Sequence, residues 1–518
     1  MTTGAERLIA TAVHNGVDVC FTNPGTTEMS LVAALDTVPG MRAVLGLFEG
    51  VVTGAADGYG RMKGTPAATL LHLGPGLANG IANLHNARRA NTPIVSIVGD
   101  HATWHLAADS PITTDIAAVA APASPWVHYV ATPADMASDT ADAIAAALTG
   151  PGQVATLIVP ADCQWSDAPD GDLPLAAPPA RAAAPDDLVA AAATALARGE
   201  TSVLFVGGPA LDAQGLRAIE RIRVATGCKV FGEVFSARTE RGRDVPWFRT
   251  LPYFPERAVE ALAGTETMVV VGTPVPVAFF GYPAMDRSEI APPGCEVLTL
   301  VDAAGDATTT LEALADAVGA APTITVDERA SVEVPSGSGL SPKTIGQAVV
   351  ALMPEHAIVV EEATTGGVGY TLKAPSAPPH TSLAITGGAI GFGLPCALGA
   401  AVAAPDRRVI SLQSDGAAMY TSSALWSMAR EGVDVTVVLF ANRKYAILQA
   451  ELERAGVKEF GPIAESLTDL HHPVLDFVKL AEGQGVPAGR ATTTDEFVAL
   501  FQRSLATPGP FLIEAVTG

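Results

Sequence analysis

Cysteine is scarce in this chain of 518 residues, with five widely separated positions. No CxxC motif and no Cys/His cluster occurs, which excludes a disulfide framework and a zinc site of the usual spacing. The chain therefore fits a reducing cytoplasm, the compartment that we expect.

Aromatic residues make up only 5% and charged residues 16%, while hydrophobic residues reach 48% and the 50 Gly and 39 Pro are scattered. This composition excludes disorder, a coiled coil and collagen, and indicates a globular protein.

Basic residues are also few. Thirty-one Lys and Arg stand against 54 Asp and Glu, giving a net charge of -23, and a surface of that sign repels phosphate backbones and anionic lipid. We expect no nucleic-acid and no membrane partner.

The beginning of the chain has no basic region followed by an apolar run, so no export signal is expected. The uncharged stretch Ala374–Pro405 is interrupted by many Pro and Gly residues, which predicts buried loop and helix around a site.

Short β-branched runs alternate with Ala-rich stretches along the whole chain. Near-continuous apolar runs of this kind are typical of parallel strands buried on both faces. Two stretches rich in Pro, Gly and small residues, Trp165–Pro185 and Asp327–Pro342, predict linkers. The fold class is therefore α/β, with three consecutive parallel-sheet domains at residues 1–170, 186–326 and 341–518. The runs are Pro93–Gly99, Ala155–Val159, Val203–Val206, Met268–Gly272, Val297–Val301, Ile358–Val360, Val409–Leu412, Val435–Phe440 and Phe511–Ala515.

An acid and an amide follow two of these strands in the third block. Asp415 with Gly416 comes after the first strand, and Asn442 comes after the second. Open α/β sheets bind ligands at the carboxyl ends of their strands. A carboxylate and an amide oxygen suit a hard divalent cation that takes further ligands from a diphosphate, which the amides after Gly416 can approach. The alternative is an Asp that caps a helix and an Asn in a turn, and these residues alone leave both interpretations open.

The first block carries a second pair of candidates. Val44–Phe48 predicts a strand, and Glu49 then opens a helix of small residues. An acid at that place is often only a partner of the helix dipole. His72 ends another predicted strand just before Gly-Pro-Gly, where a lone His is as often structural as functional.

Four segments together resemble one family. They are Ser414-Asp415-Gly416 followed by Ala441-Asn442, Glu49-Gly-x-x-x-Gly-x-Ala-Asp-Gly-Tyr59, Asn23-Pro-Gly-Thr-Thr-Glu28, and Leu71-His-Leu-Gly-Pro-Gly-Leu-Ala-Asn79. Along nearly its full length the chain resembles the thiamine-diphosphate enzymes of the acetolactate synthase and benzoylformate decarboxylase superfamily. Ser414 and Ala441 depart from the Gly and Asn that the family signature has there.

The resemblance implies pyrimidine-binding, middle and diphosphate-binding domains, and a set of site residues. Thiamine diphosphate and Mg2+, or another divalent cation, are the implied cofactors. Metal ligands would be Asp415, Asn442 and the carbonyl of Lys444. The cofactor would further contact Glu49, Thr364, Thr365, Gly388, Ile390, Gly416, Ala417, Tyr445 and Ala446, with Ile390 between its two rings. Glu49 would exchange a proton with the pyrimidine, His72 would lie over the thiazolium, and Thr26 would bind a substrate carboxylate.

The resemblance also implies decarboxylation of a 2-oxo acid, with or without carboligation to a carbonyl acceptor, through an enamine as in acetolactate synthase. A non-ligating decarboxylase of the benzoylformate type and a catalytically silent partner subunit are alternatives, and a Rossmann-type NAD enzyme is a distant third. A homodimer or homotetramer is implied, because Glu49 and Asp415 belong to domains that meet across subunits in this family. FAD is not expected, because the flavin-binding run is missing and Val206–Pro209 is a weak fingerprint. Phe279 and Phe280 stand near the place of the benzoylformate type's second His.

Overall fold

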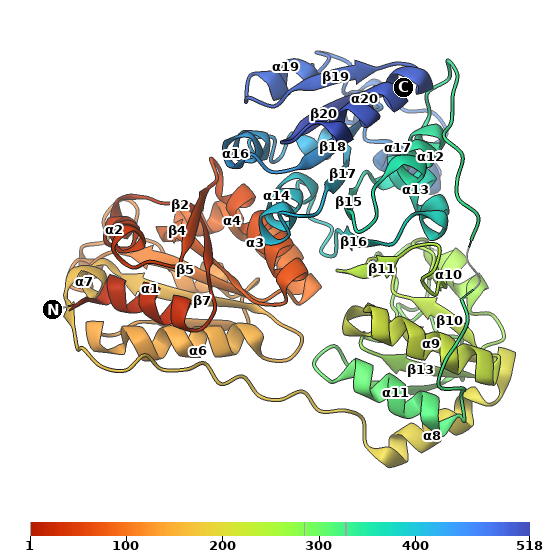
Figure 1. Cartoon of the computed structure of the whole chain (residues 1–518), viewed down its shortest axis with the longest axis horizontal. Coiled ribbons are helices and arrows are strands. Elements are labelled where there is room, and N and C mark those ends of the chain that lie inside the picture. Colours follow the sequence, from red (N-terminus) through yellow and green to blue (C-terminus); the bar gives the residue numbers. More distant parts are fainter. Residues whose placement is uncertain (1, 284, 327–328, 518) are drawn as a thin grey trace. The chain divides into compact units, whose positions relative to one another are not determined.

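The computed structural model describes residues 2–283, 285–326 and 329–517 (Figure 1). It divides into two compact units, one formed by residues 1–178 together with 331–518 and the other by residues 179–330. Of the expected linker Asp327–Pro342, residues 327 and 328 lie outside the described residues, and 329–341 have no regular structure. Several parallel sheets confirm the α/β class, whereas the exact limits of the three domains stay predictions.

The first block forms a parallel sheet with the strand order β3-β2-β4-β5-β7-β6. Every residue of β5 and β7 is buried, as the continuous apolar runs predict. The strands are β2 (Val19–Asn23), β3 (Arg42–Leu45), β4 (Ala67–His72), β5 (Ile94–Asp100), β6 (Trp126–Tyr129) and β7 (Val154–Pro160). The main helices are α1 (Gly4–His14), α2 (Met29–Thr37), α3 (Glu49–Lys63), α4 (Leu73–Ala90) and α6 (Met136–Leu148).

The third block forms a second parallel sheet, in which β16, β15, β17, β18, β20 and β19 are neighbours in that order. The strand β16 was not expected, because it is short and lies between two prolines and two glycines of the uncharged stretch. The strands are β15 (Ile358–Glu362), β16 (His380–Ala384), β17 (Val409–Ser414), β18 (Val435–Ala441), β19 (Ala488–Ala491) and β20 (Phe511–Val516). The helices include α12 (Pro342–Leu352), α13 (Val368–Lys373), α14 (Gly393–Ala403), α15 (Asp415–Ala418), α16 (Ala424–Glu431), α17 (Ala446–Arg454), α18 (Pro462–Thr468), α19 (Phe477–Glu482) and α20 (Thr494–Ala506).

Helix α3 of the first block packs closely on α14 of the third. Small residues allow this approach: a Cβ at Gly54 would lie 2.7 Å from the Pro395 ring. Arg61 of α3 forms a buried ion pair with Asp57, and its guanidinium donates to the carbonyl of Ala384 at 2.6 Å. A buried charge needs such partners to offset its desolvation. The ion pair therefore fastens α3 to the segment that leads into α14.

The second unit holds a smaller parallel sheet with the strand order β12-β10-β9-β13-β14. Its strands are β9 (Ser202–Val206), β10 (Lys229–Gly232), β12 (Arg249–Thr250), β13 (Thr267–Val271) and β14 (Glu296–Val301), with helices α8 (Asp186–Leu196), α9 (Ala213–Thr226), α10 (Pro255–Ala261) and α11 (Ala307–Ala317). Within the described ranges of the chain, no helix combines the length and apolar character that crossing a membrane requires.

Candidate functional site

The carboxyl ends of β17 and β18 bring Asp415 and Asn442 together. One carboxylate oxygen of Asp415 accepts from the backbone N–H of Arg443 at 2.6 Å, and the other accepts from that of Gly416 at 2.8 Å. Arg443 adopts a positive φ of 55°, which turns the chain back toward Asp415. Burial raises the pKa of Asp415, and the two amides oppose that shift. The loops after the two strands are thus joined through one buried carboxylate.

The residues after Asn442 surround the same place. The side-chain oxygen of Asn442 accepts from the N–H of Lys444 at 3.1 Å. The N–H of Tyr445 donates to the Thr468 carbonyl at 2.9 Å, just before α17 begins at Ala446. The ring of Tyr445 lies directly against Gly416, where a Cβ would collide with it. The glycine therefore permits the tyrosine to cover the turn after Asp415.

This donor set suits a hard cation. A carboxylate has about four lone-pair positions, so Asp415 can bind a metal while it accepts two amides. Magnesium prefers oxygen ligands and takes several from water or phosphate. In the part of the chain that the structure describes, no group of three His, Cys, Asp or Glu side chains could hold a metal alone. A cation here would thus need carbonyl and phosphate oxygens besides Asp415 and Asn442.

Thr364 and Thr365 follow β15, which lies beside β17 in the sheet. Both are exposed and begin the short 3-10 turn Thr364–Gly367, and Thr364 has a positive φ of 46°. The sheet order places their strand end next to that of Asp415.

Gly388 and Ile390 lie between β16 and α14. Gly388 is exposed and has a φ of +72°, a conformation that favours glycine. The carbonyl of Gly391 accepts from the hydroxyl of Thr421 at 2.9 Å, shortly after α15. The segment of Gly388 to Gly393 is therefore bonded to the turn that follows α15, the short helix that begins at Asp415.

Glu49 is the first residue of α3, as the sequence predicts. Asn79 of α4 donates to its carboxylate at 3.0 Å. Asn83, one turn further along α4, donates to the carbonyls of Gly50 at 2.8 Å and Gly391 at 3.3 Å. Within one chain, the helix start that carries Glu49 thus lies beside the segment of Gly388 to Gly393.

His72 ends β4 and is held by a carboxylate that the sequence analysis left without a role. Its Nδ1 lies 2.8 Å from Glu28, whose side chain is completely buried. Glu28 also accepts from the N–H of Gly25 at 2.8 Å. Since Nδ1 faces a carboxylate, its N–H donates to Glu28, and Nε2 is the ring nitrogen that Glu28 does not engage.

Thr26 is exposed, and it is Thr27 whose hydroxyl approaches His72, at 3.2 Å from Nδ1. Thr27 also donates to Glu28. His72 and Glu49 are close neighbours, since a Cβ built on Gly76 would lie 3.4 Å from the Cβ of His72 and 3.3 Å from a carboxylate oxygen of Glu49. The first block thus contributes two ionisable side chains on either side of one glycine.

Comparison with known proteins accounts for this arrangement. Two family models, described as the N-terminal and C-terminal TPP binding domains of thiamine pyrophosphate enzymes, match residues 2–119 and 367–515. One relative is a Mycobacterium tuberculosis protein named as a candidate large subunit of acetolactate synthase, IlvX. It is 50% identical to this chain, and the match covers 99% of this chain and 98% of the relative. The chain belongs to the thiamine pyrophosphate enzymes. A benzoylformate decarboxylase of Pseudomonas aeruginosa is 31% identical over 97% of both chains.

A solved structure of this enzyme family has the same fold. The thiamine diphosphate-dependent 4-hydroxybenzoylformate decarboxylase of Rhodococcus jostii superposes with a TM-score of 0.86 at 27% identity, covering 100% of this chain and 99% of the other. The likeness confirms the α/β fold class and the resemblance inferred from the motifs. The two family models match the blocks that carry Glu49 and Asp415, the residues on which the resemblance rests.

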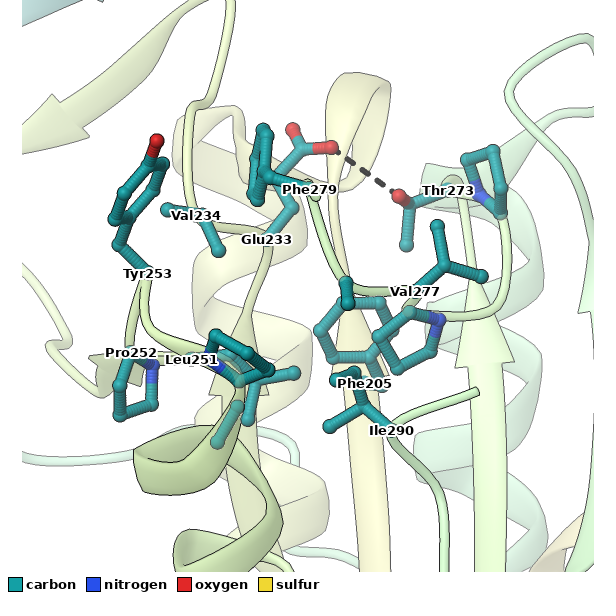
Figure 2. A pocket seen from close by; sticks show the side chains of 15 residues that line it. Phe205, Glu233, Val234, Leu251, Pro252, Tyr253, Thr273, Val277, Phe279 and Ile290 are labelled. Carbon is teal, nitrogen blue, oxygen red and sulfur yellow. Dashed lines mark hydrogen bonds between the residues drawn. The ribbon is translucent and has the colours of Figure 1, made fainter. Parts of the chain in front are cut away.

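The middle block of this thiamine pyrophosphate enzyme holds a cavity of about 140 Å³ at the carboxyl ends of β9, β10 and β13 (Figure 2). Glu233 lies above it and accepts from the N–H of Gly208 at 2.8 Å and from the hydroxyl of Thr273 at 3.1 Å. Burial raises the pKa of Glu233. Phe279 packs on Phe235 and Tyr253, with ring centroids 5.4 and 5.2 Å away, and both Phe279 and Phe280 are exposed.

Proposed function

We propose that the chain uses thiamine diphosphate and Mg2+ to decarboxylate a 2-oxo acid and to join the remaining carbon unit to a carbonyl acceptor, as acetolactate synthases do. One observation carries this proposal. The segment of Gly388 to Gly393 is bonded on one side to the helix start of Glu49, through Asn83, and on the other to the region of Asp415, through Thr421. The segment is thus in contact with both of the blocks that would supply the site.

The described residues fit both parts of the cofactor. Asp415, Asn442 and the Lys444 carbonyl would hold the cation, while the amides of Gly416 and Ala417, the Thr364 and Thr365 hydroxyls, and Tyr445 and Ala446 would contact the diphosphate. Gly388 and Ile390 would face the two rings. When bound, thiamine diphosphate supplies an acceptor for the electrons that remain when carbon dioxide leaves.

The side chains of the first block would move protons at this site. Glu49 would exchange one with the pyrimidine N1′, and the Asn79 amide holds that carboxylate in place. His72 would hold or give a proton over the thiazolium, oriented by Glu28. Thr26, exposed at the start of its turn, would meet a substrate carboxylate.

The two alternative functions, a silent partner subunit and a non-ligating decarboxylase, differ in which of these residues they require. A silent partner subunit has no need for Glu49, Asp415 and Asn442, and the retention of all three in the sequence tells against it. A non-ligating decarboxylase of the benzoylformate type is favoured by the Pseudomonas relative and the Rhodococcus structure. The candidate acetolactate synthase relative, more similar in sequence, favours ligation. The products distinguish these alternatives.

With a donor 2-oxo acid and excess aldehyde, we expect the ligated hydroxy-ketone to form faster than free aldehyde from the donor. By the resemblance, Phe279 and Phe280 stand near the place of the benzoylformate type's second His and cannot relay a proton, so His72 is left as the candidate donor and protonation should be slow. Pyruvate, 2-oxobutyrate and benzoylformate, each with both products quantified, test this. The expectation fails if free aldehyde outpaces ligation. Phe280→His should shift the ratio toward free aldehyde.

Replacing Glu28 with glutamine should lower kcat about tenfold and change KM little. The amide cannot orient the His72 ring as the buried carboxylate does, whereas substrate binding needs no contact with Glu28. Steady-state kinetics with the best donor acid measure the effect. In a His72→Gln background, Glu28→Gln should add almost nothing, because the two residues act as one unit. Additive losses would show that Glu28 acts independently of His72.

Further parts of the proposal concern the assembly and the middle domain. We propose a cytoplasmic homodimer or homotetramer, which sedimentation of the cofactor-loaded enzyme tests. We also propose that the enzyme holds no FAD. The N–H of Gly208, which a dinucleotide phosphate would need, already donates to the Glu233 carboxylate, and a second anion there would be repelled.

A further inference from the structure

The segment of Gly388 to Gly393 has most of its backbone polar groups engaged before any ligand is considered. It connects β16 to α14 and carries two of the residues proposed to face the cofactor. Two buried side chains, Glu362 and Asn86, approach it from different domains of the same chain. Neither has a role in the function proposed above.

Glu362 is the last residue of β15 and is 1% exposed. Its carboxylate accepts from three successive backbone amides, those of Gly391 at 2.8 Å, Phe392 at 2.9 Å and Gly393 at 2.7 Å. Gln413 donates a fourth bond at 2.7 Å. Burial raises the pKa of Glu362, and the four donors oppose that shift. Each bond to a charged acceptor is stronger than a bond to a neutral one.

Asn86 of α4 is completely buried and holds the residue between Gly388 and Ile390. Its amide group donates to the Ala389 carbonyl at 2.8 Å, and its side-chain oxygen accepts from the Ala389 N–H at 3.2 Å. Both backbone groups of Ala389 are thus satisfied by one side chain. Among the described residues, nothing donates to the Gly388 carbonyl, which is left available to a ligand.

Satisfying the amides at the start of α14 with a buried carboxylate has a high cost in desolvation free energy. Burying a charge costs more than burying a neutral group, and a serine or threonine would cap a helix at lower cost. What a carboxylate adds is rigidity, since it fixes three consecutive amides in one geometry. A segment fixed in advance loses less conformational entropy when a ligand binds.

We propose that Glu362 and Asn86 are positioning residues that hold the backbone of Gly388 to Gly393 in the conformation that would accept the cofactor, before the cofactor binds. Glu362 fixes the end that enters α14, and Asn86 fixes the part between Gly388 and Ile390. The inference rests on the proposed function, because it concerns the same cofactor site. It adds that the site is preformed by two residues that do not touch the reacting atoms.

Glu362→Gln tests the proposal, because glutamine keeps the size of the side chain and removes its charge. Its NH2 group would face two donors at whichever oxygen it replaces, either the amides of Gly391 and Phe392 or the amide of Gly393 and the side chain of Gln413. Calorimetry should show that thiamine diphosphate with Mg2+ binds at least tenfold more weakly, or about 1.4 kcal/mol. Inorganic pyrophosphate with Mg2+ should bind within twofold of wild type, since it would contact the proposed diphosphate and metal groups and not the segment of Gly388 to Gly393. A general loosening of the fold would weaken both ligands equally and overturn the proposal.

Glu514→Gln is the matched control. Glu514 is 0% exposed on β20 of the same sheet and pairs with Arg490, far from the segment in the chain. This variant should bind thiamine diphosphate and pyrophosphate as wild type does. If it loses thiamine diphosphate selectively, the effect of Glu362 is not specific to the segment and the proposal is wrong.

Hydrogen exchange of the cofactor-free enzyme supplies a test without ligand. The amides of Gly391 to Gly393 should exchange at least tenfold faster in Glu362→Gln, whereas those of β20 should not change. Asn86→Ala should show the same selective loss of thiamine diphosphate binding. This variant tests the proposal if Glu362→Gln does not fold. Unchanged exchange and affinity in both variants would overturn the proposal. A wild-type enzyme that binds pyrophosphate but no thiamine diphosphate would instead overturn the proposed function.

Discussion

Replacing Glu49 with glutamine is expected to leave thiamine diphosphate bound while hydrogen exchange at its C2 slows about a thousandfold or more. Glutamine has the same size and can still accept the hydrogen bond that Asn79 donates. It cannot exchange a proton with the pyrimidine N1′, and general acid–base catalysis of this kind contributes typically about 10² to 10⁴ in rate. Affinity by calorimetry and exchange by NMR are the two measurements.

Asn79→Ala is a milder variant of the same site, to be compared with Glu49→Gln. It removes the donor that holds the Glu49 carboxylate but keeps the carboxylate itself, so exchange should slow by roughly tenfold or less. If Glu49→Gln exchanges at the wild-type rate, the proton relay is wrong. If it loses the cofactor altogether, Glu49 holds the cofactor rather than moving a proton.

Replacing Asp415 with alanine should abolish metal-dependent binding of thiamine diphosphate, a loss of at least about a hundredfold in affinity. One of the two side-chain ligands disappears, and the charges of the diphosphate are left without a cation beside them. The amides of Gly416 and Arg443 also lose their acceptor, so the loops after β17 and β18 are no longer joined. Calorimetry with and without Mg2+ gives the result.

Asp406→Ala serves as the control for this experiment. Asp406 is exposed and precedes β17, whereas Asp415 follows it. The control should bind cofactor and metal normally. Unchanged, metal-dependent affinity in Asp415→Ala would remove the metal assignment, even if the rest of the site is correct.

The residues that could be predicted from the sequence stand at ends of regular elements. Glu49 begins α3, His72 ends β4, and Asp415 and Asn442 follow β17 and β18. Buried parallel strands are continuous apolar runs, so their ends are visible without a structure. A ligand site at the carboxyl edge of such a sheet then follows from topology.

The supporting residues could not be predicted in the same way. Glu28 contacts His72 over 44 positions of sequence, and Asn86 contacts Ala389 over 303. A buried polar side chain is identified by its partners, and no local pattern shows partners so distant. The acid of Asn23-Pro-Gly-Thr-Thr-Glu28 was visible within a motif, but its burial against His72 was not. Glu362 ends its strand, and its bonds to the amides of Gly391 to Gly393 cross about 30 positions of sequence.

A similar limit applies to neighbours in the sequence. The motif assigned a substrate contact to Thr26, whereas in the structure the next residue, Thr27, reaches His72. The short turn of Thr26 to Glu28 decides which hydroxyl points where. An alignment error of one residue within this turn is enough to assign the role of one threonine to the other. The contact of Thr26 with a substrate therefore stays a prediction.

The central claim is that residues of the first and third blocks together form a working thiamine diphosphate site. Hydrogen–deuterium exchange at C2 of the cofactor, bound to the wild-type enzyme with Mg2+, tests it without knowledge of the substrate. We expect exchange at least about a hundredfold faster than in free thiamine diphosphate at the same pH. A bound cofactor that exchanges no faster than the free one would contradict the account.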